Sequence, residues 1–215
     1  MNPTDAFWNI LRQFRDDTLT IQLLLILGYC ITVYRIARKP GNATDAFVKV
    51  FLAVAFLWNG IACFLIYCWE NMVAKFLAGP LYIVIGFLFL VDLFATRKTS
   101  FTFAVSPTRR AAIYIFILLA FLFPVLGIFT GHGMIALPGF PCPLAAFTLA
   151  LMAAAVPRVD GTIYALVLVW AFVNIPKVFG LVNCYEEVTL VLTGFYALAV
   201  YKTTRQDGAA AAGLH

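Results

Sequence analysis

Long apolar stretches constrain the fold of this chain more than any other feature of its sequence. Seven of them follow one another, over residues 18–36, 46–68, 76–95, 111–130, 138–157, 162–182 and 183–201. A helix crosses the hydrocarbon core of a bilayer with about 20 mostly apolar residues. Of the 215 residues, 63% are hydrophobic and 12% are charged, whereas soluble domains are about 45–50% apolar. The sequence therefore predicts an all-α, polytopic membrane helix bundle of about seven transmembrane helices.

The fifth stretch is too short to cross a bilayer by itself. Its apolar part, PLAAFTLALMAAAV at 143–156, would be about 21 Å long as a helix, whereas the hydrocarbon core is about 30 Å thick. We therefore expect part of the segment before it to lie at membrane depth.

Positive charge follows alternate stretches. Lys and Arg residues come after the first, third, fifth and seventh stretches, namely Arg35, Arg38, Lys39, Lys49, Arg97, Lys98, Arg109, Arg110, Arg158, Lys202 and Arg205. Connections of this kind face the cytoplasm. We expect a multi-pass protein of the bacterial inner (cytoplasmic) membrane, with its N-terminus outside and its C-terminus cytoplasmic.

The pattern divides the chain into three parts. Residues 1–17 place Phe7, Ile10, Leu11 and Phe14 at helical spacing, which predicts an amphipathic interfacial helix; the alternative is a flexible leader. Residues 18–202 are expected to form the transmembrane bundle. Residues 203–215 are expected to be a disordered cytoplasmic tail.

The segment GHGMIALPGFPCP, residues 131–143, interrupts the helical pattern with glycines and prolines. Irregular backbone at membrane depth is stable only where protein buries it or where it lines a wet cavity, and broken helices often carry the binding sites of transporters. His132 and Cys142 are therefore candidate binding residues. The alternative is that GHG is a tight turn and PCP simply begins a helix, since proline suits a first helical turn.

Three further candidates lie near the ends of the last two stretches: Asn174, Lys177 and Glu187. Ionisable groups inside a span are costly and mark functional sites, so we expect Lys177 to pair with Glu187. Alternatively, Lys177 extends its ammonium to the interface and Asn174 only bonds to a neighbouring helix. Glu186 is expected to be wet, and Asp92 to form a surface ion pair with the basic residues that follow it.

Cysteine placement leaves two possibilities open. Cys68, Cys142 and Cys184 are all expected at the outer ends of helices, where two of them could form a disulfide. Alternatively, Cys142 and His132 could hold a soft metal ion such as Cu(I) or Zn(II). No spacing typical of a metal site is present, and we assign no metal ligand.

Several function classes find no support. The sequence contains no GxSxG, HExxH, P-loop or GxGxxG motif, so the enzyme classes that these motifs mark are not indicated, and no cofactor is specified. The net charge of +5 comes from residues beside apolar stretches, where they orient a membrane protein, and gives no case for nucleic-acid binding.

The chain resembles an uncharacterised family of small bacterial multispanning membrane proteins, a domain of unknown function often labelled a permease. The resemblance lies in GHG, an apolar spacer, PCP and a Phe-Thr pair, here Gly131, His132, Gly133, Pro141, Cys142, Pro143, Phe147 and Thr148. The leader FWNILRQF and the acidic pair of YEEVTLVLTG are also similar. Leu19-Thr20 stands where the family tends to have Trp-Pro. The resemblance supports the fold and the choice of residues but implies no established activity.

The sequence thus predicts a bundle in the lipid bilayer with an outward-facing polar cavity framed by His132, Cys142, Lys177 and Glu187, with Asn174 nearby. Its expected ligand is a small solute or ion, which makes a permease the favoured function. The alternatives are a metal-handling or redox protein that uses Cys142 and His132, and an accessory subunit of a larger membrane complex. Homo-oligomerisation is also possible.

Overall fold

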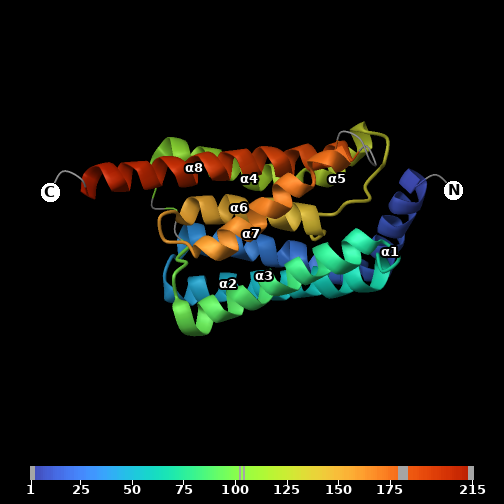
Figure 1. Ribbon diagram of the computed structural model, residues 1–215, viewed down its shortest axis with the longest axis horizontal. Helices are drawn as coiled ribbons and strands as arrows, with labels where there is room; N and C mark the ends of the chain where they lie inside the picture. Colours follow the sequence, from blue (N-terminus) through green and yellow to red (C-terminus); the bar gives the residue numbers. More distant parts are fainter. Residues whose placement is uncertain (1–2, 102, 104, 179–183, 213–215) are drawn as a thin grey trace.

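The chain runs back and forth between the two ends of an elongated helical bundle (Figure 1). The computed structural model describes residues 3–101, 103, 105–178 and 184–212, and within these ranges it contains helices and turns but no strand. We call the end that holds the first turns of helix α1 the N-terminal end. The opposite end, where α8 finishes, is the C-terminal end.

The first half of the chain forms three passes. Their elements are α1 (Pro3–Arg38), α2 (Asn42–Trp58), η1 (Asn59–Tyr67), η2 (Ala74–Ala78), α3 (Gly79–Val91) and η3 (Asp92–Thr96). The second half comprises α4 (Pro107–Phe121), α5 (Phe123–Phe129), α6 (Pro141–Ala155), α7 (Gly161–Val173), η5 (Tyr185–Glu187) and α8 (Val188–Ala212).

Three helices are long and apolar enough to cross a membrane: Thr4–Arg38, Asn42–Tyr67 and Ala74–Thr96. Helices α4 and α5 add a fourth if they count as one span, although they are bent by 59°. Pro124 lies in the first turn of α5, and the bend follows because proline cannot donate the backbone hydrogen bond that a continuous helix needs. Among the described residues, length and composition thus give three or four spans where the sequence predicts about seven.

Two predicted boundaries differ from the structure. The first 17 residues are not a separate helix, because α1 continues without a break from Pro3 through residue 18 to Arg38. Residues 203–212, predicted to be disordered, continue helix α8 to Ala212.

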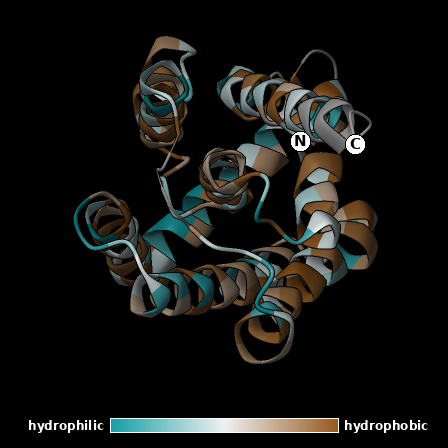
Figure 2. Cartoon of the chain, turned by 90° about the vertical axis from the view of Figure 1, so that its left-hand side faces the viewer, coloured by the Kyte–Doolittle hydropathy of each residue, from teal (hydrophilic) through white to brown (hydrophobic). Residues whose placement is uncertain are grey.

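Helix α6 lies inside the bundle, and Figure 2 shows one helix enclosed by others when the molecule is viewed along its length. All 15 residues of α6 are buried, and α6 packs against α4, α7 and α8. Its small side chains, six of them alanine, let these neighbours approach closely. A helix enclosed by protein need not match the thickness of a bilayer, which accounts for the short fifth stretch.

Candidate functional site

Two adjacent carboxylates, Glu186 and Glu187, lie buried at the N-terminal end of the bundle. They belong to η5, the single 3-10 turn that leads into α8, and their residues are only 1% and 4% exposed. The turn packs against α5. This burial contradicts the expectation that Glu186 is wet, because α5 and the segment after it cover the turn.

Glu187 accepts two hydrogen bonds through the same oxygen. The Lys177 ammonium lies 2.6 Å from Glu187 Oε1, and the Cys142 thiol donates to the same atom at 3.0 Å. The Lys177 ammonium also lies 5.3 Å from the centre of the Phe7 ring of α1. The structure thus contains the ion pair that the sequence predicts, with Cys142 from the first turn of α6 as its third member.

Glu186 has a separate set of partners. Its Oε1 accepts the Thr130 hydroxyl at 2.7 Å and lies 2.8 Å from His132 Nδ1. The His132 ring stacks on Trp8 of α1, with 3.9 Å between ring centres. The imidazole of His132 therefore lies between the buried carboxylate of Glu186 and the Trp8 ring.

A tight turn places His132 against Glu186. The amides of His132 and Gly133 both donate to the Gly127 carbonyl at 2.9 Å, and Gly131 and Gly133 have φ values of 87° and 75°, which glycine adopts without strain. Pro141 lies in the first turn of α6. The alternative interpretation of the backbone is therefore the one observed: GHG forms a turn and PCP begins a helix.

Asn174 takes no part in this cluster of contacts. Its side-chain amide donates to the carbonyl of Trp170, one turn earlier in the chain, at 2.6 Å. Asn174 ends α7, and its carbonyl accepts the backbone amide of Lys177 at 3.0 Å. These two contacts of Asn174 are with its own segment of the chain, between Trp170 and Lys177.

Each carboxylate retains one oxygen without a hydrogen-bond partner in the described part of the chain, Glu186 Oε2 and Glu187 Oε2. Buried polar atoms in proteins are nearly always paired with protein or water. These two oxygens are the carboxylate atoms of the site that have no described hydrogen-bond donor.

An open hollow of about 440 Å³ adjoins the site. It is lined by Thr4, Asp5, Trp8, Asn9, Arg12, Gly131 and His132. Of the four residues predicted to frame an outward cavity, this lining includes His132. Cys142, Lys177 and Glu187 are not among its lining residues.

The cysteines give the metal and disulfide alternatives no support. All five are free. Cys142 bonds to Glu187, whereas His132 bonds to Glu186, so the two proposed ligands are held by different carboxylates. Within the described ranges, no group of three or more His, Cys, Asp or Glu residues could hold a metal ion.

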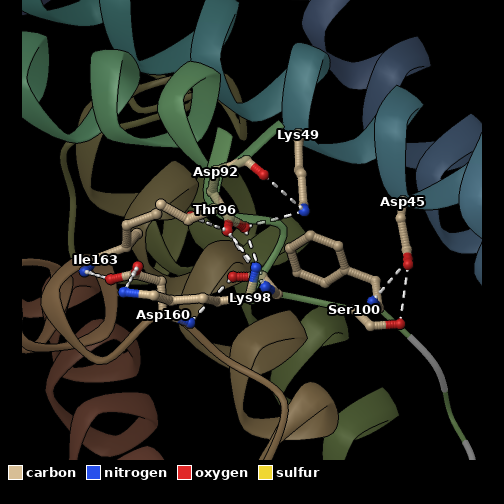
Figure 3. A network of polar contacts seen from close by, with 10 residues as sticks. Asp45, Lys49, Asp92, Thr96, Lys98, Ser100, Asp160 and Ile163 are labelled. Atoms are coloured by element: carbon tan, nitrogen blue, oxygen red, sulfur yellow. Dashed lines mark hydrogen bonds and ion pairs between the residues drawn. The ribbon is translucent and has the colours of Figure 1, made fainter. Parts of the chain in front are cut away.

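A second buried ion pair lies at the C-terminal end. Asp92 is 1% exposed and its carboxylate lies 3.0 Å from the Lys49 ammonium (Figure 3). It also accepts the Thr96 hydroxyl at 2.7 Å and the Lys98 amide at 2.6 Å. The prediction of a surface ion pair for Asp92 is wrong, because the chain folds back over it after η3. Lys49 stands within an apolar stretch, which was the one available signal.

Two more aspartates bind the segment that follows η3. Asp45 accepts the Ser100 hydroxyl at 2.9 Å and the Phe101 amide at 2.7 Å, while Asp160 lies 3.3 Å from the Lys98 ammonium (Figure 3). These contacts join the segment after η3 to both α2 and the start of α7. They close the C-terminal end of the bundle, opposite the Glu186–Glu187 site.

Comparison with known proteins identifies a family for this chain but no individual protein that resembles it. No curated protein and no solved structure matches the chain. A family of unknown function matches residues 4–211, which is nearly the whole chain and includes every residue of the site. The chain therefore belongs to the family of unknown function DUF6064.

Proposed function

We propose that this protein is a small membrane permease that moves a small solute or ion and exchanges protons at Glu186 and Glu187. The observation that carries the proposal is the pair of adjacent buried carboxylates, each bound to a group that can hold a proton or positive charge, His132 or Lys177. Ionisable groups inside membrane helices are rare and mark ion pathways and proton relays.

The surroundings of the carboxylates support the same function. The bend between α4 and α5 and the irregular residues 131–140 lie beside the site, and interrupted helices are where transporters bind their substrates. The positive charges at the C-terminal end favour a cytoplasmic position for that end. The site then opens toward the outside, through the hollow beside His132.

Proton movement in liposomes tests the proposal. The purified protein is reconstituted with a pH-sensitive dye inside the vesicles, and a potassium diffusion potential is applied, first alone and then with small amines, amino acids or carboxylates outside. We expect proton entry above that of protein-free vesicles. Glu187→Gln, which cannot ionise, should lower the rate by about 100-fold, the usual contribution of a positioned proton-transfer group.

Glu70→Gln is the matched control, because Glu70 is an exposed carboxylate and its loss should leave proton entry close to the wild-type rate. Wild-type vesicles that remain as tight as protein-free vesicles under every condition would overturn the permease proposal. An accessory subunit would give that result and would also co-purify with a larger complex.

A further inference from the structure

Helix α1 has an inverted distribution of polar residues. Every third or fourth residue forms a buried stripe along the helix: Thr18, Gln22, Leu25, Tyr29, Thr32 and Ile36. Four of these six side chains are polar. From residue 19 to residue 34 the exposed positions of the same helix are mostly apolar: Leu19, Leu23, Leu24, Leu27, Ile31 and Tyr34. This pattern suits a helix with lipid on one side and a polar interior on the other.

Three polar atoms of the stripe have no hydrogen-bond partner within the described residues: Gln22 Oε1, the Tyr29 hydroxyl and Thr32 Oγ1. The three residues are at most 1% exposed. Thr18 differs, since its hydroxyl donates to the Phe14 carbonyl. An unpaired polar atom in an apolar interior is unfavourable, and bound water is the usual partner of such groups.

The stripe begins beside the candidate site. A side chain at Gly139 would collide with Gln22, and the Gly139 carbonyl accepts the Asn59 amide at 3.0 Å. Asn59 Oδ1 is a fourth buried atom without a described partner. Gln22 and Asn59 thus meet the backbone just before the first turn of α6, which carries Cys142.

From Gln22 to Thr32 the stripe extends for about 15 Å along the helix, which is half of a hydrocarbon core about 30 Å thick. Aromatic rings surround its middle. The Tyr29 ring lies 5.1, 5.8 and 4.4 Å from the ring centres of Phe51, Phe121 and Phe147. The Tyr29 hydroxyl is therefore a polar atom on a side chain packed among aromatic rings.

We propose that water molecules bind along this stripe of α1, from Gln22 to Thr32, and form an internal track that leads from the Glu186–Glu187 site toward the C-terminal end. The presence of water does not depend on permease activity. The role of the track as the route of the transported proton or ion rests on the proposed function.

Radiolytic labelling of the full-length protein in lipid nanodiscs tests the track. X-rays split water into hydroxyl radicals, and a buried side chain is oxidised only if water lies beside it. Tyr82 and Tyr164 are matched controls, because both are buried and their hydroxyls donate at 2.7 Å to the carbonyls of Pro141 and Ala197. Mass spectrometry should show Tyr29 oxidised several times faster than either control. Equal rates for the three tyrosines would overturn the track.

A second experiment distinguishes two explanations of fast Tyr29 oxidation, namely water bound along the stripe and general loosening of the structure. Thr32→Val keeps the shape of the side chain but removes its hydroxyl, and should slow the oxidation of Tyr29. Thr193→Val is the control, because the Thr193 hydroxyl is buried but donates to the Thr189 carbonyl at 2.7 Å, and it should leave the Tyr29 rate unchanged. Slowing by both variants alike, or by neither, would contradict the proposal.

The labelling and liposome results are independent. If Tyr29 is oxidised quickly but the protein passes no protons, the result would support the proposed water track and contradict the proposed permease function. If the protein passes protons but Tyr29 is oxidised as slowly as Tyr82, the result would support the permease function and contradict the proposed track, so the protons would follow another route.

Discussion

Lys177 and Glu187 form one ion pair, but they differ in their access to water. The Lys177 side chain is 27% exposed, whereas that of Glu187 is 5% exposed. A buried charge that loses its partner is strongly destabilising, while one that can reach water is not. The two halves of the pair should therefore respond differently to substitution.

We expect Lys177→Met to lower the free energy of unfolding by about 3–5 kcal/mol, because it leaves Glu187 buried with only the Cys142 thiol as a partner. Glu187→Gln should cost clearly less, since the Lys177 ammonium can turn toward water. Thermal unfolding in detergent measures both. The double variant should recover part of the loss seen in Lys177→Met; equal losses in the two single variants would contradict this account.

The elements divide into those that periodicity predicts and those that it does not. Residues 18–36, 46–67 and 76–95 lie within the three long helices. Parts of the second and third of these helices are π-helix, at Asn59–Tyr67, Ala74–Ala78 and Asp92–Thr96. The predicted boundary at residue 17 is wrong because only the composition changes there, from polar to apolar. The backbone continues as one helix, α1, on both sides of that residue. The bend before Pro124 was not predicted. A proline inside an apolar run is compatible both with one kinked helix and with two separate helices, and the sequence does not distinguish them.

The site shows a similar contrast. Pairing of Lys177 with Glu187 could be predicted, since two ionisable groups near the ends of neighbouring stretches have few other partners. Neither the burial of Glu186 nor its bond to His132 could be, because both depend on how the 127–133 turn folds over η5. The Lys49–Asp92 pair joins residues 43 positions apart, a distance that spacing along the chain does not constrain.

Close packing around α6 gives a prediction for that element. Ala150 is fully buried, so Ala150→Leu should destabilise the protein by about 1–3 kcal/mol, because the added methyl groups must displace neighbouring helices. Ala199→Leu in α8 is the control, since Ala199 is exposed and the same enlargement there meets no neighbour. Melting temperatures in detergent compare the two; a tolerated leucine at 150 would indicate that α6 is loosely packed.

At the scale of the whole molecule, charge separates the two ends. The C-terminal end carries most of the Lys and Arg residues, including those beside Asp92 and Asp160, whereas the N-terminal end holds Asp5, Glu70 and the Glu186–Glu187 pair. Because basic connections usually face the cytoplasm, we predict that the C-terminal end lies in the cytoplasm.

Reporter fusions at the C-terminus measure that orientation. Green fluorescent protein should fluoresce there and alkaline phosphatase should be inactive, because the first matures in the cytoplasm and the second only outside it. Fusions after Glu70, at the opposite end, should give the reverse pattern. An active phosphatase at the C-terminus would show that the site faces the cytoplasm.

Enclosure of α6 also bears on how the protein is synthesised. A segment enters the lipid from the translocon by its own hydrophobicity and length, and α6, with 15 residues, is shorter than the roughly 20 that such entry requires. Its neighbours α7 and α8 emerge from the ribosome after it. We therefore predict that α6 stays in contact with protein until those two helices arrive, and that the bundle closes around it only when the last helix has been made.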